Sequence, residues 1–160
     1  MTEACANGVC EVPDKETTRP CPRCNGKGKR VKGVTIRYLV RGTFQSRIHD
    51  SLTYRFCPSP DCPVVYYSET GDAQFTKDEL SERVTIKEKD DPLPVCYCFN
   101  FFRHDIREEI EKTGKTTVPD FISAQVKAGN CLCEYTNPQG TCCLGNVSAA
   151  VKQIQKEGKK

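Results

Sequence analysis

The sequence predicts an α+β fold in which a small antiparallel β-rich half is followed by a helical half. Short runs of β-branched and aromatic residues, separated by Gly, Pro, Asp and Ser, fill the region from residue 20 to about residue 90. Beyond it, apolar residues recur at helical spacing. Hydrophobic residues make up only 37% of the 160 positions, Trp is absent and 12 positions are Cys. Two small cores of this composition need cross-links or bound metals, in addition to apolar burial, to be stable.

The amino-terminal half is expected to span residues 20–91. Residues 1–19 are polar and without periodicity, so we expect a mobile tail in which Cys5 and Cys10 stand out. Four runs are predicted as strands: V-T-I-R-Y-L-V (34–40), L-T-Y-R-F (52–56), V-V-Y-Y (64–67) and R-V-T-I (83–86). The segment K-D-D-P-L-P (89–94) combines two prolines with three charges, which is typical of a linker.

The helical half is expected to span residues 92–160. A first helix is predicted from about residue 100 to residue 112, because apolar residues recur every fourth position before Gly114. The second starts after Thr117 as N-cap, buries Ile122 and Val126, and stops at Gly129. The third begins near residue 146 and carries one apolar stripe.

Composition excludes several classes of protein. No window approaches the roughly 20 consecutive apolar residues of a membrane span, so no membrane insertion is expected. The first ten residues lack the pattern of a secretory signal, which predicts a cytoplasmic, reducing environment. A net charge of +3 is too small for a general nucleic-acid binder. The sequence contains no phosphate-binding loop, Ser-His-Asp pattern or H-E-x-x-H motif that would predict enzymatic catalysis. At most we expect a metal-ion reductase activity.

Four cysteines of the β-rich half have the spacing of a zinc ribbon. Cys21 and Cys24 form C-P-R-C, and Cys57 and Cys62 form C-P-S-P-D-C after an interval of 32 residues. Two such knuckles can complete a tetrahedron of thiolates around zinc. All four positions are Cys, which leaves no open coordination site and indicates a structural metal. Zinc binding of this kind contributes on the order of 10 kcal/mol to folding.

The cysteines of the helical half have a different spacing. Cys96 and Cys98 form C-Y-C before the first helix, and 32 residues separate Cys98 from Cys131. This C-x-C pair, followed by a helical pair and a further cysteine pair, resembles bacterioferritin-associated ferredoxin. That resemblance implies a [2Fe-2S] cluster. Thiolates just before helices are well placed for one, because free N–H groups at helix N-termini can point at sulfur.

The identity of two cluster ligands is left open by the sequence. The ferredoxin family ends in C-x2-C, whereas here ten residues separate Cys131 from Cys142 and Cys143. The predicted ligands are Cys96, Cys98, Cys131 and Cys143. Cys131 is chosen because it follows the Gly129 stop, and Cys143 because it lies closer to the third helix. Cys133 and Cys142 are the alternates.

Together, C-P-R-C-N-G-K-G, F-C-P-S-P-D-C-P-V-V-Y-Y, P-V-C-Y-C-F and C-L-C-E-Y-T-N-P-Q-G-T-C-C-L-G-N-V resemble the amino-terminal module of archaeal CopZ-type copper chaperones over about residues 20–155. The resemblance implies one zinc, one [2Fe-2S] cluster and a role in copper homeostasis. The M-x-C-x-x-C copper loop of that family is absent from this sequence, in which Met1 is the single methionine.

The function expected from this resemblance is one-electron transfer linked to copper, by reducing or passing on the metal. Cys5 and Cys10 are candidate ligands for Cu(I), because soft thiolates favour this ion. The expected partner is a redox protein or a copper transporter or chaperone. Two alternatives remain: a ferredoxin-like electron carrier for another oxidoreductase, and a redox-sensing interaction protein.

Overall fold

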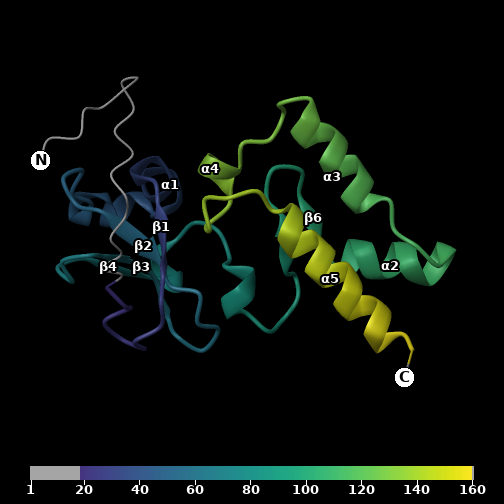
Figure 1. The fold of residues 1–160 in the computed structure, drawn as a ribbon, viewed down its shortest axis with the longest axis horizontal. Helices are drawn as coiled ribbons and strands as arrows, with labels where there is room; N and C mark the ends of the chain where they lie inside the picture. Colours follow the sequence, from purple (N-terminus) through teal and green to yellow (C-terminus); the bar gives the residue numbers. More distant parts are fainter. Residues whose placement is uncertain (1–18, 160) are drawn as a thin grey trace, which may run out of the picture.

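The protein is described by a computed structural model over residues 19–159. The predicted tail, with the candidate ligands Cys5 and Cys10, lies outside the described residues apart from Arg19. Figure 1 shows a sheet with its helix α1 on one side of the molecule and helices α2, α3 and α5 on the other. No helix in the range 19–159 combines the length and the apolarity that crossing a membrane requires.

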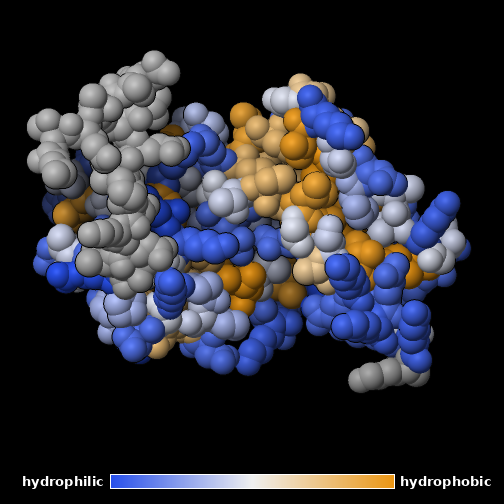
Figure 2. Space-filling view, in the orientation of Figure 1, coloured by the Kyte–Doolittle hydropathy of each residue, from blue (hydrophilic) through white to orange (hydrophobic). Residues whose placement is uncertain are grey.

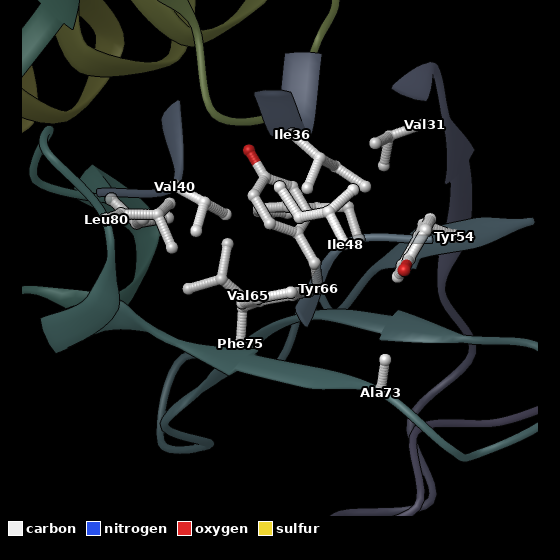
Figure 3. Packing of buried hydrophobic residues seen from close by; sticks show 12 residues of the cluster. Val31, Ile36, Val40, Ile48, Tyr54, Val65, Tyr66, Ala73, Phe75 and Leu80 are labelled. Carbon is white, nitrogen blue, oxygen red and sulfur yellow. The ribbon is translucent and has the colours of Figure 1, made fainter. Parts of the chain in front are cut away.

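The amino-terminal half is built on a four-stranded antiparallel sheet. Its strands are adjacent in chain order: β1 (Lys29–Val31), β2 (Tyr54–Phe56), β3 (Val64–Ser68) and β4 (Gln74–Thr76). Helix α1 (Gly33–Leu39) and the 3-10 turns η1 (Gly42–Arg47), η2 (Lys77–Glu79) and η3 (Thr85–Lys87) complete it. The predicted strands at 52–56 and 64–67 are therefore confirmed as β2 and β3. Figure 3 shows the core, in which side chains from β3 and β4 meet those of α1.

Strand β3 faces two different clusters because its pairing is irregular. The register with β4 shifts between Val64 and Tyr66, which interrupts the alternation of side chains. Val65 and Tyr66 consequently lie in the apolar core, whereas Val64 and Tyr67 pack with buried cysteines of the C-x-x-C and C-x4-C motifs. One strand thus connects the hydrophobic core to the cysteine site.

The knuckle that carries the first two cysteines requires glycine at position 28. The Gly28 N–H donates to the Tyr67 hydroxyl over 3.2 Å, and a Cβ at this position would lie 2.4 Å from that hydroxyl and 2.8 Å from the Phe56 carbonyl oxygen. We expect Gly28→Ala to cost about 1–3 kcal/mol in the free energy of unfolding, the usual cost of overpacking. A Cβ at Gly33 would meet no other side chain or distant backbone within 4 Å, so Gly33→Ala is the control. Urea unfolding should separate the two variants, and equal stability would contradict the close contact.

Two of the predicted strands are wrong. The run 34–40 forms helix α1 because its buried residues Ile36, Leu39 and Val40 follow a helical period. As a strand it would have buried Tyr38, which is 63% exposed. The run 83–86 leads into the 3-10 turn η3, whose last side chain turns inward. The β-branched composition of both runs favoured strands, and tertiary packing overrode it.

The carboxyl-terminal half contains the three predicted helices and one further turn. After the hairpin of β5 (Pro94–Cys96) and β6 (Phe101–Phe102) come α2 (Arg103–Thr113), α3 (Val118–Lys127), the one-turn helix α4 (Cys133–Thr136) and α5 (Leu144–Glu157). Helix α2 ends at Gly114 with a left-handed backbone, as expected. Ile106, Ile122, Val147 and Ile154 form the core between the helices. Val126, expected inside, is 38% exposed, and Val118 is buried instead.

The two halves contact each other through α1 and α4, which lie side by side in Figure 1. The rings of Tyr38 and Tyr135 meet edge to face at 4.8 Å between centroids, and Lys32 forms an ion pair with Glu134. From the sheet core, the Tyr66 hydroxyl donates a hydrogen bond to the Pro138 carbonyl oxygen. The segment after α4 is therefore anchored to the amino-terminal core.

Candidate metal centres

The four cysteines predicted for zinc lie together. The Sγ atoms of Cys21, Cys24, Cys57 and Cys62 are all within 4.8 Å of one another. The Cys21 and Cys62 sulfurs are 3.9 Å apart, and those of Cys24 and Cys57 are 3.5 Å apart. Tetrahedral Zn–S bonds of about 2.3 Å require sulfurs roughly 3.8 Å apart. The four thiols therefore fit a closed zinc site.

Hydrogen bonds and burial act in opposite directions on these thiols. The Ser59 hydroxyl lies 3.3 Å from the Cys24 sulfur, and this hydrogen bond lowers the pKa of Cys24 to about 6. Burial instead raises the pKa of Cys57 and raises that of Cys62 to about 12. Buried thiols of raised pKa ionise when a cation is present to balance the thiolate charge.

A buried lysine that belongs to no sequence motif supports this site. Lys87 is 5% exposed. Its ammonium donates to the carbonyl oxygens of Ser59 at 2.7 Å and of Cys62 at 3.0 Å. It thus holds the backbone of the second knuckle, and its positive charge offsets part of the negative charge of four thiolates around a divalent ion.

Replacing this lysine should weaken zinc binding. We expect Lys87→Met to destabilise the fold by about 2–4 kcal/mol, since two charge-assisted hydrogen bonds are lost, and to lower zinc affinity by roughly 10–100-fold. Competition with a chelator and urea unfolding measure the two effects. Lys89→Met is the control, because the Lys89 side chain is 84% exposed. An affinity equal to that of the control would contradict the assigned role.

A second group of thiols lies in the carboxyl-terminal half. The Cys98 and Cys133 sulfurs are 3.5 Å apart, and Cys143 is hydrogen-bonded to both Cys96 and Cys133. Cys96, Cys133 and Cys143 are buried, and Cys98 is half-buried. The hydrogen bonds with Cys143 lower the pKa of Cys133 to about 5 and that of Cys96 to about 7. The bonds with its two partners raise the pKa of Cys143 itself.

Hydrogen-bond donors surround the sulfurs of this second group. The Leu132 N–H donates to the Cys98 sulfur over 3.2 Å, and the Thr136 hydroxyl lies 3.1 Å from the same atom. Backbone N–H groups of Cys98 and Phe99 contact the Cys96 sulfur. Such N–H···S bonds are what a cysteine-ligated iron–sulfur cluster uses, so this donor set fits a [2Fe-2S] group.

The other two cysteines of this half differ in their contacts: Cys131 is hydrogen-bonded to Cys133 and packs against the same cluster, whereas Cys142 is not part of that cluster. Cys142 is exposed and Cys131 is half-exposed. Cys133, named above as an alternate, is brought next to Cys98 and Cys143 by the one-turn helix α4, which starts at Cys133. The sequence offers no signal for this turn, because four residues are too few to show a period.

The tyrosine of the C-Y-C motif links the two centres. The Tyr97 hydroxyl donates to the Arg83 carbonyl oxygen at 2.6 Å and lies 3.1 Å from the Thr85 hydroxyl. Thr85 and Lys87 belong to the same single turn, η3. One turn therefore contacts the zinc knuckle on one side and the loop of Cys96 and Cys98 on the other.

Comparisons with known proteins agree with this arrangement. Residues 18–81 match a CopZ family described as a zinc binding domain. The copper chaperone CopZ of Archaeoglobus fulgidus is 36% identical over 123 residues, which are 77% of this chain and 57% of that protein. The chain thus spans little more than half of the relative's length. The X-ray structure of the Archaeoglobus fulgidus CopZ N-terminal domain superimposes with a TM-score of 0.67 at 33% identity, covering 81% of this chain and 95% of that domain.

Proposed function

This chain belongs to the CopZ family as a zinc-binding module of the amino-terminal type, and from that premise we propose that it transfers single electrons in copper homeostasis. In this proposal Cys21, Cys24, Cys57 and Cys62 hold a structural zinc ion. The carboxyl-terminal thiols hold a [2Fe-2S] cluster. The two centres belong to an amino-terminal module of residues 20–91 and a helical module of residues 92–160.

The observation that carries the proposal is the group of four carboxyl-terminal thiols with N–H donors at their sulfurs. We assign Cys96, Cys98, Cys133 and Cys143 as cluster ligands, because their sulfurs form one chain of contacts and Cys133 is buried, whereas Cys131, which is hydrogen-bonded to Cys133, is half-exposed. Cys131, the ligand favoured by spacing alone, is the alternative to Cys133. When bound, the cluster supplies a one-electron redox couple whose potential depends on hydrogen bonds and burial.

The residues around these thiols keep the site dry and fixed. Val95, Ile106, Ile122 and Val147 pack against them in one apolar cluster. The Leu132 N–H directs a positive dipole at the Cys98 sulfur, which favours the more negative, reduced charge state. The half-buried Cys98 is the most accessible of the four, so we expect electrons to enter and leave on its side.

Copper is proposed as the metal that receives the electron, because the relative from Archaeoglobus fulgidus is a copper chaperone. A redox partner protein supplies one electron to this chain, and that electron converts one Cu(II) to one Cu(I). The Cu(I) then passes to a copper transporter or chaperone. Thiolates of this chain are suitable ligands for the product, since soft ligands favour Cu(I).

The test is metal analysis of anaerobically purified protein together with copper reduction. We expect about two irons and one zinc per chain, as these two sites require, and an EPR signal after dithionite. After removal of excess dithionite, Cu(II) is added with the Cu(I) indicator bicinchoninate. One Cu(I) should form per reduced chain and none with Cys133→Ser. A reduced, iron-loaded chain that leaves Cu(II) unchanged favours the simple carrier, and a chain without iron contradicts the electron-transfer role.

A further inference from the structure

The exposed large hydrophobic side chains of residues 19–159 gather beside the carboxyl-terminal thiols. These side chains, which we call the apolar patch, are Tyr38, Phe121, Val126, Leu132 and Tyr135. Val126, Leu132 and Tyr135 line one cavity of about 330 Å³, and Cys131 and Cys133 also line it. Tyr38 joins the patch through the contact between its ring and that of Tyr135. Figure 2 accordingly shows apolar surface over the region between α3 and α4.

Two members of the patch contact the loop that carries Cys96 and Cys98. Leu132 is 57% exposed, and its N–H donates to the Cys98 sulfur over 3.2 Å. The ring of Phe121 meets that of Phe99, the residue after Cys98, edge to face at 5.6 Å between centroids. A single hydrogen bond thus connects the backbone of an exposed residue to a proposed cluster ligand, which gives electrons a short route between that ligand and the surface.

The composition of the patch suits contact with another protein. Contiguous apolar surface on a folded protein marks an interaction site, whereas scattered single residues do not. Aromatic side chains are enriched in interfaces, because they supply a large contact area at low entropic cost. Three of the five members of the patch are aromatic. The patch therefore fits a protein partner that binds over the Cys98 side of the cluster loop.

The α1 side of the patch is basic. Residues 19–49, which include α1, contain nine Lys or Arg residues and no Asp or Glu. Three of these basic residues are exposed and form no ion pair with another described residue, namely Lys29, Arg30 and Arg41. An approaching acidic surface is therefore attracted to this side of the patch.

The α3 and α4 side of the patch carries little charge of its own. Residues 118–143 contain one basic residue, Lys127, and two acidic residues, Asp120 and Glu134. Glu134 is neutralised by its ion pair with Lys32. A second copy of this chain would add the same excess of basic charge to the interface, whereas an acidic partner neutralises that excess. Charge therefore favours an acidic partner over a second copy.

We propose that the apolar patch and the basic residues beside it dock an acidic protein that carries single electrons. This inference rests on the proposed function, because it takes the carboxyl-terminal thiols to hold the cluster. In the complex one electron leaves the reduced carrier and enters the cluster on the Cys98 side. The carrier is oxidised by one electron, the cluster is reduced by one electron, and no covalent bond forms between the two proteins.

The test uses flavodoxin, an acidic flavin protein that carries single electrons, with the full chain loaded with iron and zinc. Its anionic hydroquinone gives one electron to the chain and becomes the neutral semiquinone, whose absorption counts the electrons in stopped-flow experiments. Titration calorimetry separately measures the affinity between the two oxidised proteins. We expect a 1:1 complex. The rate constant should fall by about 10-fold as the ionic strength rises from about 0.01 to 0.15 M, because the Debye length shortens from about 30 to 8 Å.

Two variants test the two parts of the surface. Leu132→Gln removes an apolar side chain but keeps its backbone N–H, and it should lower the affinity and the rate constant by about 10-fold, as loss of an interface hot spot does. Lys127→Glu should lower the low-salt rate constant by about 3–10-fold and flatten its salt dependence. Lys112→Glu is the matched control, since the Lys112 side chain is 75% exposed on α2, away from α4 (Figure 1). Reduction by dithionite, which requires no protein docking, should be equal in all variants.

The outcomes separate this surface from its alternatives. Equal affinities and rate constants in the parent, Leu132→Gln and Lys127→Glu overturn the surface. Tighter binding of cytochrome c, a basic one-electron carrier, overturns the acidic partner. A dimer of the parent that Leu132→Gln dissociates, detected by sedimentation, assigns the patch to a second copy and also overturns the proposal. A preparation that never contains iron contradicts the proposed function instead, and calorimetry of the zinc-loaded chain with flavodoxin then decides the surface.

Discussion

Cys57→Ser is expected to unfold the amino-terminal half of the chain. The Cys57 side chain is fully buried, and its sulfur lies 3.5 Å from that of Cys24 in the proposed zinc site. Zinc bound by four thiolates contributes on the order of 10 kcal/mol, while whole domains are stable by only about 5–15 kcal/mol. Removing one ligand should therefore abolish the cooperative thermal transition of this half. Circular dichroism during heating, with zinc analysis, measures the effect.

The control for this variant is Cys142→Ser, which makes the same chemical change at an exposed cysteine outside both thiol groups. It should keep one zinc per chain and the melting temperature of the parent. A chelator added to the unmodified chain should reproduce the Cys57→Ser result, because it removes the same metal. If Cys57→Ser retains zinc and melts like its control, the site is not the main source of stability in this half.

Cys133→Ser is expected to remove the iron, whereas Cys131→Ser should keep it. Cys133 is buried and contacts both Cys98 and Cys143, while Cys131 is half-exposed and is hydrogen-bonded to Cys133. A [2Fe-2S] cluster is held by four cysteine thiolates, two on each iron, so loss of an inward thiol leaves one iron with a single protein ligand. Visible absorption, iron analysis and EPR of the reduced protein report the cluster directly.

Each of these two variants is the matched control for the other, since the same substitution is made two residues apart. Retention of the cluster in Cys133→Ser with its loss in Cys131→Ser would reverse the assignment and restore the ligand set favoured by spacing. Loss in both would mean that the cluster needs both thiols or that the loop cannot tolerate serine, and either result would contradict the assignment of Cys133 alone. The zinc content of both variants, expected to be unchanged, shows whether the amino-terminal half remains folded.

The larger elements of the fold follow from local patterns. Helices α2, α3 and α5 have apolar residues at helical intervals, and α2 and α3 also have clear stop signals. The zinc cysteines are predictable because each pair sits in a short motif whose spacing reflects metal geometry. Helix α1 is not predictable from the sequence. Its run of β-branched residues, Val34, Thr35 and Ile36, favours a strand more strongly than the spacing of its buried residues favours a helix.

What the sequence does not predict depends on contacts between distant segments. Lys87 reaches carbonyl groups 25 and 28 positions earlier in the chain, and no local pattern marks a lysine for burial. The choice between Cys131 and Cys133 depends on a one-turn helix that packs beside α1. Ser59 and Tyr97 do carry a signal, because each lies inside a cysteine motif, and residues there are close to the sulfurs by chain connectivity.

The position of the turn η3 in the chain bears on the order in which the two halves fold during synthesis. Chains fold from the amino terminus during synthesis, and every cysteine of the zinc site, together with Lys87, precedes the C-Y-C motif. The Arg83 carbonyl and the Thr85 hydroxyl, which the Tyr97 hydroxyl contacts, also precede it. An amino-terminal half that has already folded around zinc therefore presents the groups that the Tyr97 hydroxyl contacts before the C-Y-C loop folds. Under the proposed function we therefore expect that zinc supply during translation influences how readily the second centre is loaded.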